Sequence, residues 1–438
     1  MVGRTRNLHG AVAGAAAGML CLQALPALAQ GTGERASGLT FGIEQRLEAG
    51  ENLGLDVPAT GTSAIATTRL SLSYFDSTAV SRLAIDLGGV LRFADTPETD
   101  SGNGFADPSA RLSYTRAGAN ASLSLIAEAS QSDLTFDRDL SDFIGEDGTI
   151  DLPDDFDLTG EGLRNTYSVA AELSLRSRAP LSYVLGAAYE VTDYTDTGTS
   201  TLADETALRL DATANLRLSA ISSGSVALGY DDIQTDDATE THRKITSLTF
   251  GYQRELSPIL RVGASLGLTH TDREVVGPVT STENETTVRV NATRDLPNGS
   301  IGGNIGVTWP DEGGSELVGQ IDWRQALPTG SISATFTQEA STTTDGETRP
   351  TTALSVSYGH DINAVSGVDF GLTYVIASGT ATRNRVAESD LSVTYRRSLT
   401  EDWALRTGLS YKTRDEETVG SAASPFAFVS IGRSFDLR

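Results

Sequence analysis

The sequence predicts an all-β protein: a transmembrane, antiparallel, up-and-down β-barrel of about 20 strands, within a range of roughly 18 to 22. Three observations predict it. Apolar and polar side chains alternate with a period of two along most of the chain, short and longer connections take turns, and after the first 30 residues no segment holds 18 consecutive apolar residues.

The alternation gives each predicted strand one apolar face and one polar or small face, because successive side chains of a strand point to opposite sides. One example has Leu260, Val262, Ala264, Leu266 and Leu268 on one face, with Arg261, Gly263, Ser265, Gly267 and Thr269 on the other. Strands that face lipid on one side and a polar interior on the other show this pattern.

The connections support a chain that passes back and forth through a bilayer. Segments such as 76–78, 222–224 and 296–299 are short, whereas 50–63, 94–106, 194–204, 274–284, 342–349 and 413–423 are longer, acidic and rich in Thr and Gly. Short turns at one rim and longer loops at the other are typical of barrels of this kind. A soft repeat of an aromatic or Ala followed by Arg and Leu, as in 252–256 and 395–399, marks the ends of successive hairpins.

The amino terminus predicts export. Arg4 and Arg6 precede a small or apolar run from Gly10 to Leu25, and Ala27-Leu28-Ala29 offers a small-residue cleavage site. We therefore expect residues 1–29 to be a cleaved signal peptide and 30–438 a single barrel domain. The only cysteine, Cys21, would leave with the signal, so we expect no disulfide and no thiolate chemistry.

The composition argues against nucleic acid as a partner. The chain has 58 acidic residues against 33 lysines and arginines, a formal net charge of −25. Binding to phosphate backbones needs a basic face instead. Nearly all the bases are arginines, because Lys244 and Lys412 are the only lysines.

The last strand carries a resemblance to a known group. The segment Phe426 to Phe435 alternates apolar residues and closes on Phe, with Val429, Ile431 and Phe435 on one face, although Asp436-Leu437-Arg438 follow the aromatic. It resembles the terminal strand of Gram-negative outer-membrane proteins, and the whole chain resembles proteobacterial β-barrels, both porins and barrels associated with exopolysaccharide export. The resemblance implies location in the outer membrane, contact with its lipid, and recognition of the last strand by the barrel-assembly machinery. The resemblance also allows the protein to form a homo-oligomer.

Two sets of charged residues are candidates for a pore. Seven arginines fall on the polar parity of their strands and are expected to face the lumen: Arg92, Arg111, Arg209, Arg217, Arg261, Arg289 and Arg406. The longest connection, 134–162, is the third of the longer loops and carries ten acids: Asp137, Asp139, Asp142, Glu146, Asp147, Asp151, Asp154, Asp155, Asp157 and Glu161. Folded into the lumen, this acidic loop would face the arginines and limit solute size; the alternative is a surface loop kept soluble by its charge.

Cofactor and catalytic chemistry have weaker support. The carboxylates of 134–162 offer oxygen ligands for Ca²⁺, but their spacing does not match an EF-hand loop, so we expect no resident cofactor or metal. His242 and His270 lie on neighbouring predicted strands with Asp272 nearby, yet their parity matches the lipid-facing residues and no serine is placed beside them. We therefore do not expect this protein to be an enzyme.

Three functions follow from these observations. The leading interpretation is a porin-like channel for passive passage of small hydrophilic solutes. The first alternative is an accessory or scaffold barrel of a polysaccharide export or surface-assembly system. The second, least supported, is a hydrolase with its site at the rim.

Overall fold

The structure is a computed structural model of the 438-residue chain. It describes residues 37–97, 103–136, 162–197, 202–237, 240–276, 280–311, 314–342, 348–380 and 384–437. The expected signal peptide lies outside these residues.

The described residues form 20 strands and no helix, which confirms the predicted fold class. They are β1 (Ser37–Glu51), β2 (Thr62–Ser77), β3 (Ser81–Asp95), β4 (Gly104–Ala117), β5 (Ala121–Asp133), β6 (Leu163–Leu175), β7 (Leu181–Thr195), β8 (Glu205–Arg217), β9 (Ser222–Thr235), β10 (Thr241–Ser257), β11 (Leu260–Glu274), β12 (Thr280–Leu296), β13 (Gly299–Pro310), β14 (Glu316–Leu327), β15 (Gly330–Thr342), β16 (Thr348–Asn363), β17 (Ser366–Ala377), β18 (Val386–Ser398), β19 (Trp403–Glu416) and β20 (Gly420–Asp436).

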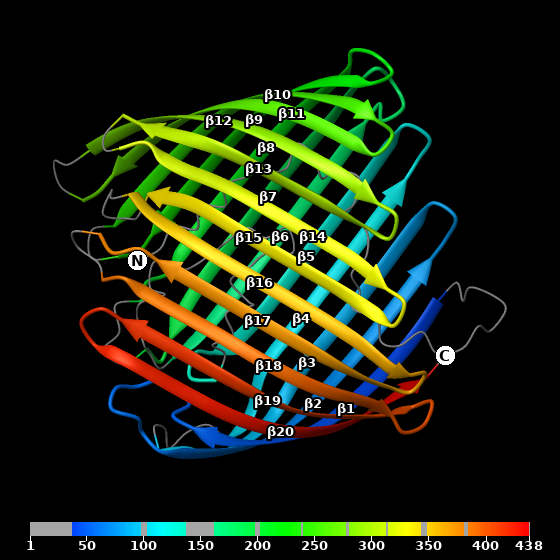
Figure 1. The fold of residues 1–438 in the computed structure, drawn as a ribbon, viewed down its shortest axis with the longest axis vertical. Coiled ribbons are helices and arrows are strands. Elements are labelled where there is room, and N and C mark those ends of the chain that lie inside the picture. The colour runs from blue at the N-terminus through cyan, green and yellow to red at the C-terminus, as the bar shows by residue number, and fades with distance from the viewer. Residues whose placement is uncertain are drawn as a thin grey trace.

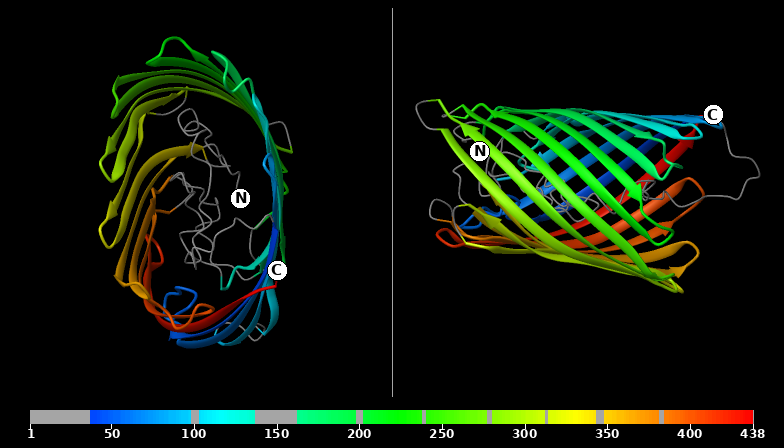
Figure 2. Two further views of the ribbon diagram at one scale, coloured as in Figure 1. Left: turned by 90° about the vertical axis from the view of Figure 1, so that its right-hand side faces the viewer. Right: turned by 90° about the horizontal axis from the view of Figure 1, so that it is seen from above.

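Each strand pairs antiparallel with its neighbour in the chain, and the sheet closes on itself. The closure is the pairing of β1 with β20, in which Phe41 lies opposite Phe435 and Gly50 opposite Phe426. The strands are steeply tilted, and the barrel has an oval outline when it is viewed from one end (Figures 1 and 2). Closure leaves no open sheet edge, so the backbone amides and carbonyls of the strands find partners within the wall.

The two faces of the wall differ as the alternation predicts. Large apolar side chains with the highest exposure, such as Phe93, Leu228 and Leu409, share one parity along their strands, while the opposite parity carries serines, threonines and charged residues. In a closed barrel the exposed apolar parity faces outward, and it forms the lipid-facing surface. We call the opposite parity the inner wall. No helix among the residues described is long and apolar enough to cross a membrane.

The rims are less uniform than the sequence suggested. One rim, here called the turn rim, carries only connections of a few residues, such as 258–259 and 328–329. The opposite loop rim carries the long connection between β5 and β6, as predicted. The expected loop at 413–423, however, is a tight turn at 417–419, because strand pairing between β19 and β20 continues to Glu416 and Gly420.

One proline lies within the sheet. Pro425 is part of β20, opposite Tyr411 of β19. The β1 partner of β20 begins only at Phe426, so Pro425 stands just beyond the part of β20 that is paired on both sides. A missing backbone donor is tolerated where one neighbouring strand is absent.

Candidate functional site: the inner wall of the barrel

All seven predicted arginines lie on the inner-wall parity of their strands. In β8, for example, Leu208 and Leu210 are exposed while Arg209 between them is buried. In β19, the outward Leu409 and Tyr411 set the parity that places Arg406 on the inner wall. The seven nevertheless differ in their surroundings, and they fall into a buried and an exposed group.

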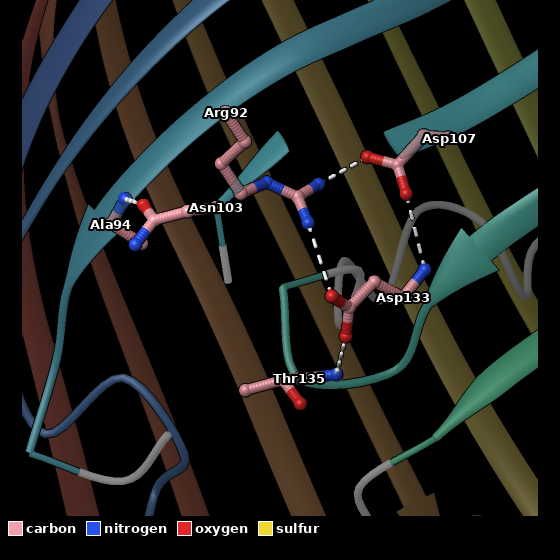
Figure 3. A network of polar contacts seen from close by, with 6 residues as sticks. All are labelled: Arg92, Ala94, Asn103, Asp107, Asp133 and Thr135. Atoms are coloured by element: carbon pink, nitrogen blue, oxygen red, sulfur yellow. Dashed lines mark hydrogen bonds and ion pairs between the residues drawn. The ribbon is translucent and has the colours of Figure 1, made fainter. Parts of the chain in front are cut away.

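Arg92 is the most constrained of the buried arginines. Its Nη1 donates to Asp133 Oδ2 at 3.2 Å, and its Nη2 pairs with the carboxylate of Asp107 (Figure 3). The Arg92 side chain is only 7% exposed. Two carboxylates around one buried guanidinium satisfy its charge, so Arg92 is a structural clamp rather than a free cation on the inner wall.

A β-bulge supplies one of these carboxylates. The register between β3 and β4 shifts between Gly88 and Val90, and Asp107 in the bulged part of β4 has a φ of 48°. The bulge turns the Asp107 carboxylate toward Arg92 and toward the Asp133 amide, which donates to Asp107 Oδ1 at 3.1 Å. Bulges commonly re-aim side chains in this way. Pro108, within the strand, is the only sign of the bulge in the local sequence.

The same network holds the start of the long connection between β5 and β6. The Thr135 amide donates to Asp133 Oδ1 at 3.1 Å, and the Phe136 ring lies 4.1 Å from the Arg92 guanidinium carbon. The Leu134 amide donates to the Gly162 carbonyl at 2.9 Å and closes the base. Residues 134–136 are therefore attached to an inner-wall side chain. The ten predicted acids, Asp137 to Glu161, lie outside the described residues, as does nearly all of the segment considered for Ca²⁺.

Two more predicted arginines are largely buried. Arg209 Nη1 lies 3.9 Å from Glu190 Oε2, and both side chains are mostly shielded from solvent. Arg289 stands on the inner wall of β12, on the same parity as Glu285, whose carboxylate accepts a hydrogen bond from Thr287 at 3.0 Å. At both places an arginine and a glutamate lie on the inner wall, between the middle of the barrel and the loop rim.

The other four predicted arginines are exposed. Arg111 pairs with Glu128, which lies directly opposite it on β5, and Arg261 Nη2 lies 3.3 Å from Asp295 Oδ1. Arg217 ends β8 at the turn rim, and Arg406 lies near the start of β19. These four therefore have accessible side chains on the inner wall, unlike the three buried arginines.

The inner wall holds further ion pairs that were not predicted. Arg414 Nη1 donates to Glu388 Oε1 at 2.7 Å, and Lys412 Nζ lies 4.0 Å from Asp390 Oδ2. Near the turn rim, Arg396 bridges Asp361 at 2.7 Å and Asp369 at 2.9 Å. The parity of each strand places these residues inward, but their pairing depends on the register between strands, which alternation alone does not supply.

The histidines considered for catalysis lie on the outward face near the loop rim. His242 Nε2 is 2.8 Å from Asp232 Oδ1, and His270 Nδ1 is 2.7 Å from Asn284 Oδ1. Asp272 contacts His270 at 3.4 Å rather than His242. Within the described ranges, no group of three or more His, Cys, Asp or Glu side chains is arranged to hold a metal ion.

Comparisons with known proteins show the fold. No protein-family model matches the sequence, and no curated protein matches it. Solved structures do match. The FrpB iron transporter from Neisseria meningitidis has a TM-score of 0.53 and 6% identity, over 91% of this chain and 82% of that one. The ferric-catecholate import receptor Fiu from E. coli K12 has 0.51 and 10%, over 92% and 82%. OccK9 (OpdG) from Pseudomonas aeruginosa has 0.42 and 15%, over 91% and 98%.

The closed antiparallel barrel, its outward apolar surface and this likeness define the class of protein. The chain is an outer-membrane β-barrel protein, located in the outer membrane as the sequence predicted.

Proposed function

We propose that the barrel is a porin-like channel through which small hydrophilic solutes cross the outer membrane passively. The observation that carries the proposal is the inner wall, where exposed charged residues, Arg111 with Glu128 and Arg261 with Asp295, stand on strands whose other face is apolar. Charged groups that remain in water along a membrane-spanning wall are suited to hydrophilic solutes.

The attachment of the long acidic connection supports a second part of the proposal. Near its start, Phe136 lies against Arg92, a side chain on the inner wall, and the Thr135 amide donates to Asp133, which pairs with Arg92. A connection that starts from the inner side is well placed to lie in the path of solutes. We therefore propose that the acids of 137–161 restrict passage by size and charge, in opposition to the arginines of the wall.

The main experiment is conductance of the purified protein in planar bilayers. Stable single-channel steps, together with swelling of protein-loaded liposomes in small sugars but not in large ones, are expected for an open channel. A folded, heat-modifiable barrel that conducts no ions would contradict the proposal and favour the scaffold alternative.

A charge-reversal variant tests the wall itself. Arg261→Glu places two carboxylates in contact with each other and is expected to shift the reversal potential toward cation selectivity. Arg254→Glu is the matched control, because it makes the same change of charge at a residue of outward parity on the neighbouring strand β10. An equal shift in both variants would contradict the assignment of Arg261 to the solute path.

A further inference from the structure

The outward face of the barrel has opposite charges at its two rims. Five arginines have outward parity within the last four residues of strands that run toward the turn rim, and they form what we call the arginine belt: Arg116 (β4), Arg254 (β10), Arg294 (β12), Arg397 (β18) and Arg433 (β20). Among the described residues, Asp76 and His360 are the other outward Asp, Glu, His, Lys or Arg side chains in corresponding terminal positions.

The loop rim has the reverse composition. Outward side chains in the corresponding terminal positions include the carboxylates Glu51, Asp95, Asp193, Asp232, Asp272, Glu274 and Asp415. The one lysine there, Lys244, has its Nζ 3.7 Å from Glu274 Oε1. Within the described strands no arginine takes an outward terminal position at this rim, and Arg385, the residue before β18, pairs with the outward Asp415 at 3.3 Å. The outward charge therefore changes sign from one end of the barrel to the other.

Four of the five belt arginines lack a charged partner among the described residues, whereas Arg433 pairs with Asp402. Within the part of the chain that the structure describes, Arg116, Arg254, Arg294 and Arg397 form no ion pair, and all four are exposed. The contrast with Arg396 is direct, because this inward neighbour of Arg397 contacts both Asp361 and Asp369. An unpaired guanidinium at the edge of an apolar surface is placed to bind an anion from outside the protein.

Aromatic side chains indicate how deep the arginine belt lies in the membrane. Tyr114, Tyr252 and Tyr395 each precede a belt arginine by two residues and share its outward face. The fifth arginine, Arg433, lies 4.4 Å from the Phe435 ring and 5.4 Å from the Trp403 ring, and it pairs with Asp402 at 3.7 Å. Tyrosine and tryptophan mark the membrane–water interface, so the arginines two residues nearer the rim stand at the level of the headgroups.

We propose that the arginine belt binds the phosphodiester headgroups of anionic phospholipids in the leaflet at the turn rim. The guanidinium fork matches phosphate oxygens, and basic groups beside a membrane span attract anionic lipid. The acidic loop rim repels the same headgroups. The belt therefore makes the protein selective for the lipid of one leaflet, independently of whether the lumen conducts.

The three tryptophans of the chain provide the test. Trp403 lies outward at the turn rim beside Arg433, whereas Trp309 lies outward near the loop rim. One single-tryptophan protein carries Trp309→Phe and Trp323→Phe, and the other carries Trp323→Phe and Trp403→Phe. Each is reconstituted into phosphatidylcholine vesicles with a fixed fraction of phosphatidylglycerol, with bromine on the chains of one lipid or of the other. The ratio of the two quenching efficiencies measures local enrichment of the anionic lipid.

We expect phosphatidylglycerol to be enriched about fivefold around Trp403 for each arginine in contact, and not enriched around Trp309. Arg397→Gln with Arg433→Gln should remove the enrichment. The matched control is Arg69→Gln with Arg82→Gln, which removes the same charge from exposed residues of inward parity and should leave the enrichment unchanged. Equal quenching ratios at the two tryptophans, or an enrichment that survives in the belt variant, would overturn the proposal.

Inorganic phosphate separates a lipid site from a site for free anions. It is compared with sodium chloride at the same ionic strength. Equal loss of enrichment in both salts reports screening of a lipid contact. A larger loss with phosphate shows that the belt takes the free anion instead, and it would contradict the assignment to lipid.

Discussion

The guanidinium carbon of Arg92 lies 4.1 Å from the centre of the Phe136 ring, and this contact joins strand β3 to the first residues of the long acidic connection. The same guanidinium is held by Asp107 and Asp133. One buried arginine thereby ties two strands and a loop base together at a bulge in the wall.

Removal of this clamp should destabilise the barrel. Arg92→Ala leaves two partly buried carboxylates without their cation, and we expect a loss of about 3 kcal/mol in the free energy of unfolding. Unfolding in urea, followed by heat modifiability on gels, measures it. Arg111→Ala is the comparison: its side chain is 54% exposed, and its loss should cost less than about 1 kcal/mol. Similar costs for the two variants would argue against a buried clamp.

The pair of Arg414 and Glu388 should show strong coupling. Their atoms are 2.7 Å apart and both side chains are about nine-tenths buried. A double-mutant cycle with Arg414→Met and Glu388→Gln is expected to give a coupling of about 2 kcal/mol in unfolding free energy. Strictly additive effects would show that each residue is held by other contacts.

Leu409 and Ser410 are adjacent in β19 and have opposite parity. Leu409→Arg puts a charge on the lipid face and should destabilise the folded barrel by about 2–4 kcal/mol, if its depth is near the bilayer midplane. Ser410→Arg puts the same charge on the inner wall and should cost much less. Denaturant titration in phospholipid vesicles compares the two variants, and a reversed order of stability would refute the assignment of faces.

The Arg92 clamp should also affect passage of solutes. If the connection restricts the channel, Arg92→Ala loosens its start and should raise single-channel conductance and its fluctuations. The measurement is single-channel recording at several salt concentrations. A variant that folds and conducts as the native protein does would separate the clamp from the solute path and leave it a purely structural role.

The sequence predicted the strands well because each one carries its own signal. Period-two alternation and the turns predicted about 20 strands, the described residues form 20, and the parity placed Arg209 and Arg406 on the inner wall. It did not predict that Arg92 is clamped, because the Asp107 carboxylate reaches it through a bulge and a positive φ. It also missed the pairing of Arg414 with Glu388, since register between strands is fixed by turns and packing rather than by alternation. The expected loop at 413–423 failed for the same reason: Thr, Gly and acidic residues are typical of loops, yet strand pairing continued through them.

The pairing of β1 with β20 has a consequence for how the wall gains its stability. Every other pairing joins strands that are neighbours in the chain, so those hairpins can form locally, whereas Phe41 and Phe435 meet only across almost the whole described sequence. Until they meet, the nascent sheet presents two unsatisfied backbone edges, which the interior of a bilayer cannot hydrate. Folding of the whole barrel is therefore cooperative. The pairing of β1 with β20 decides whether the other strands remain in the membrane.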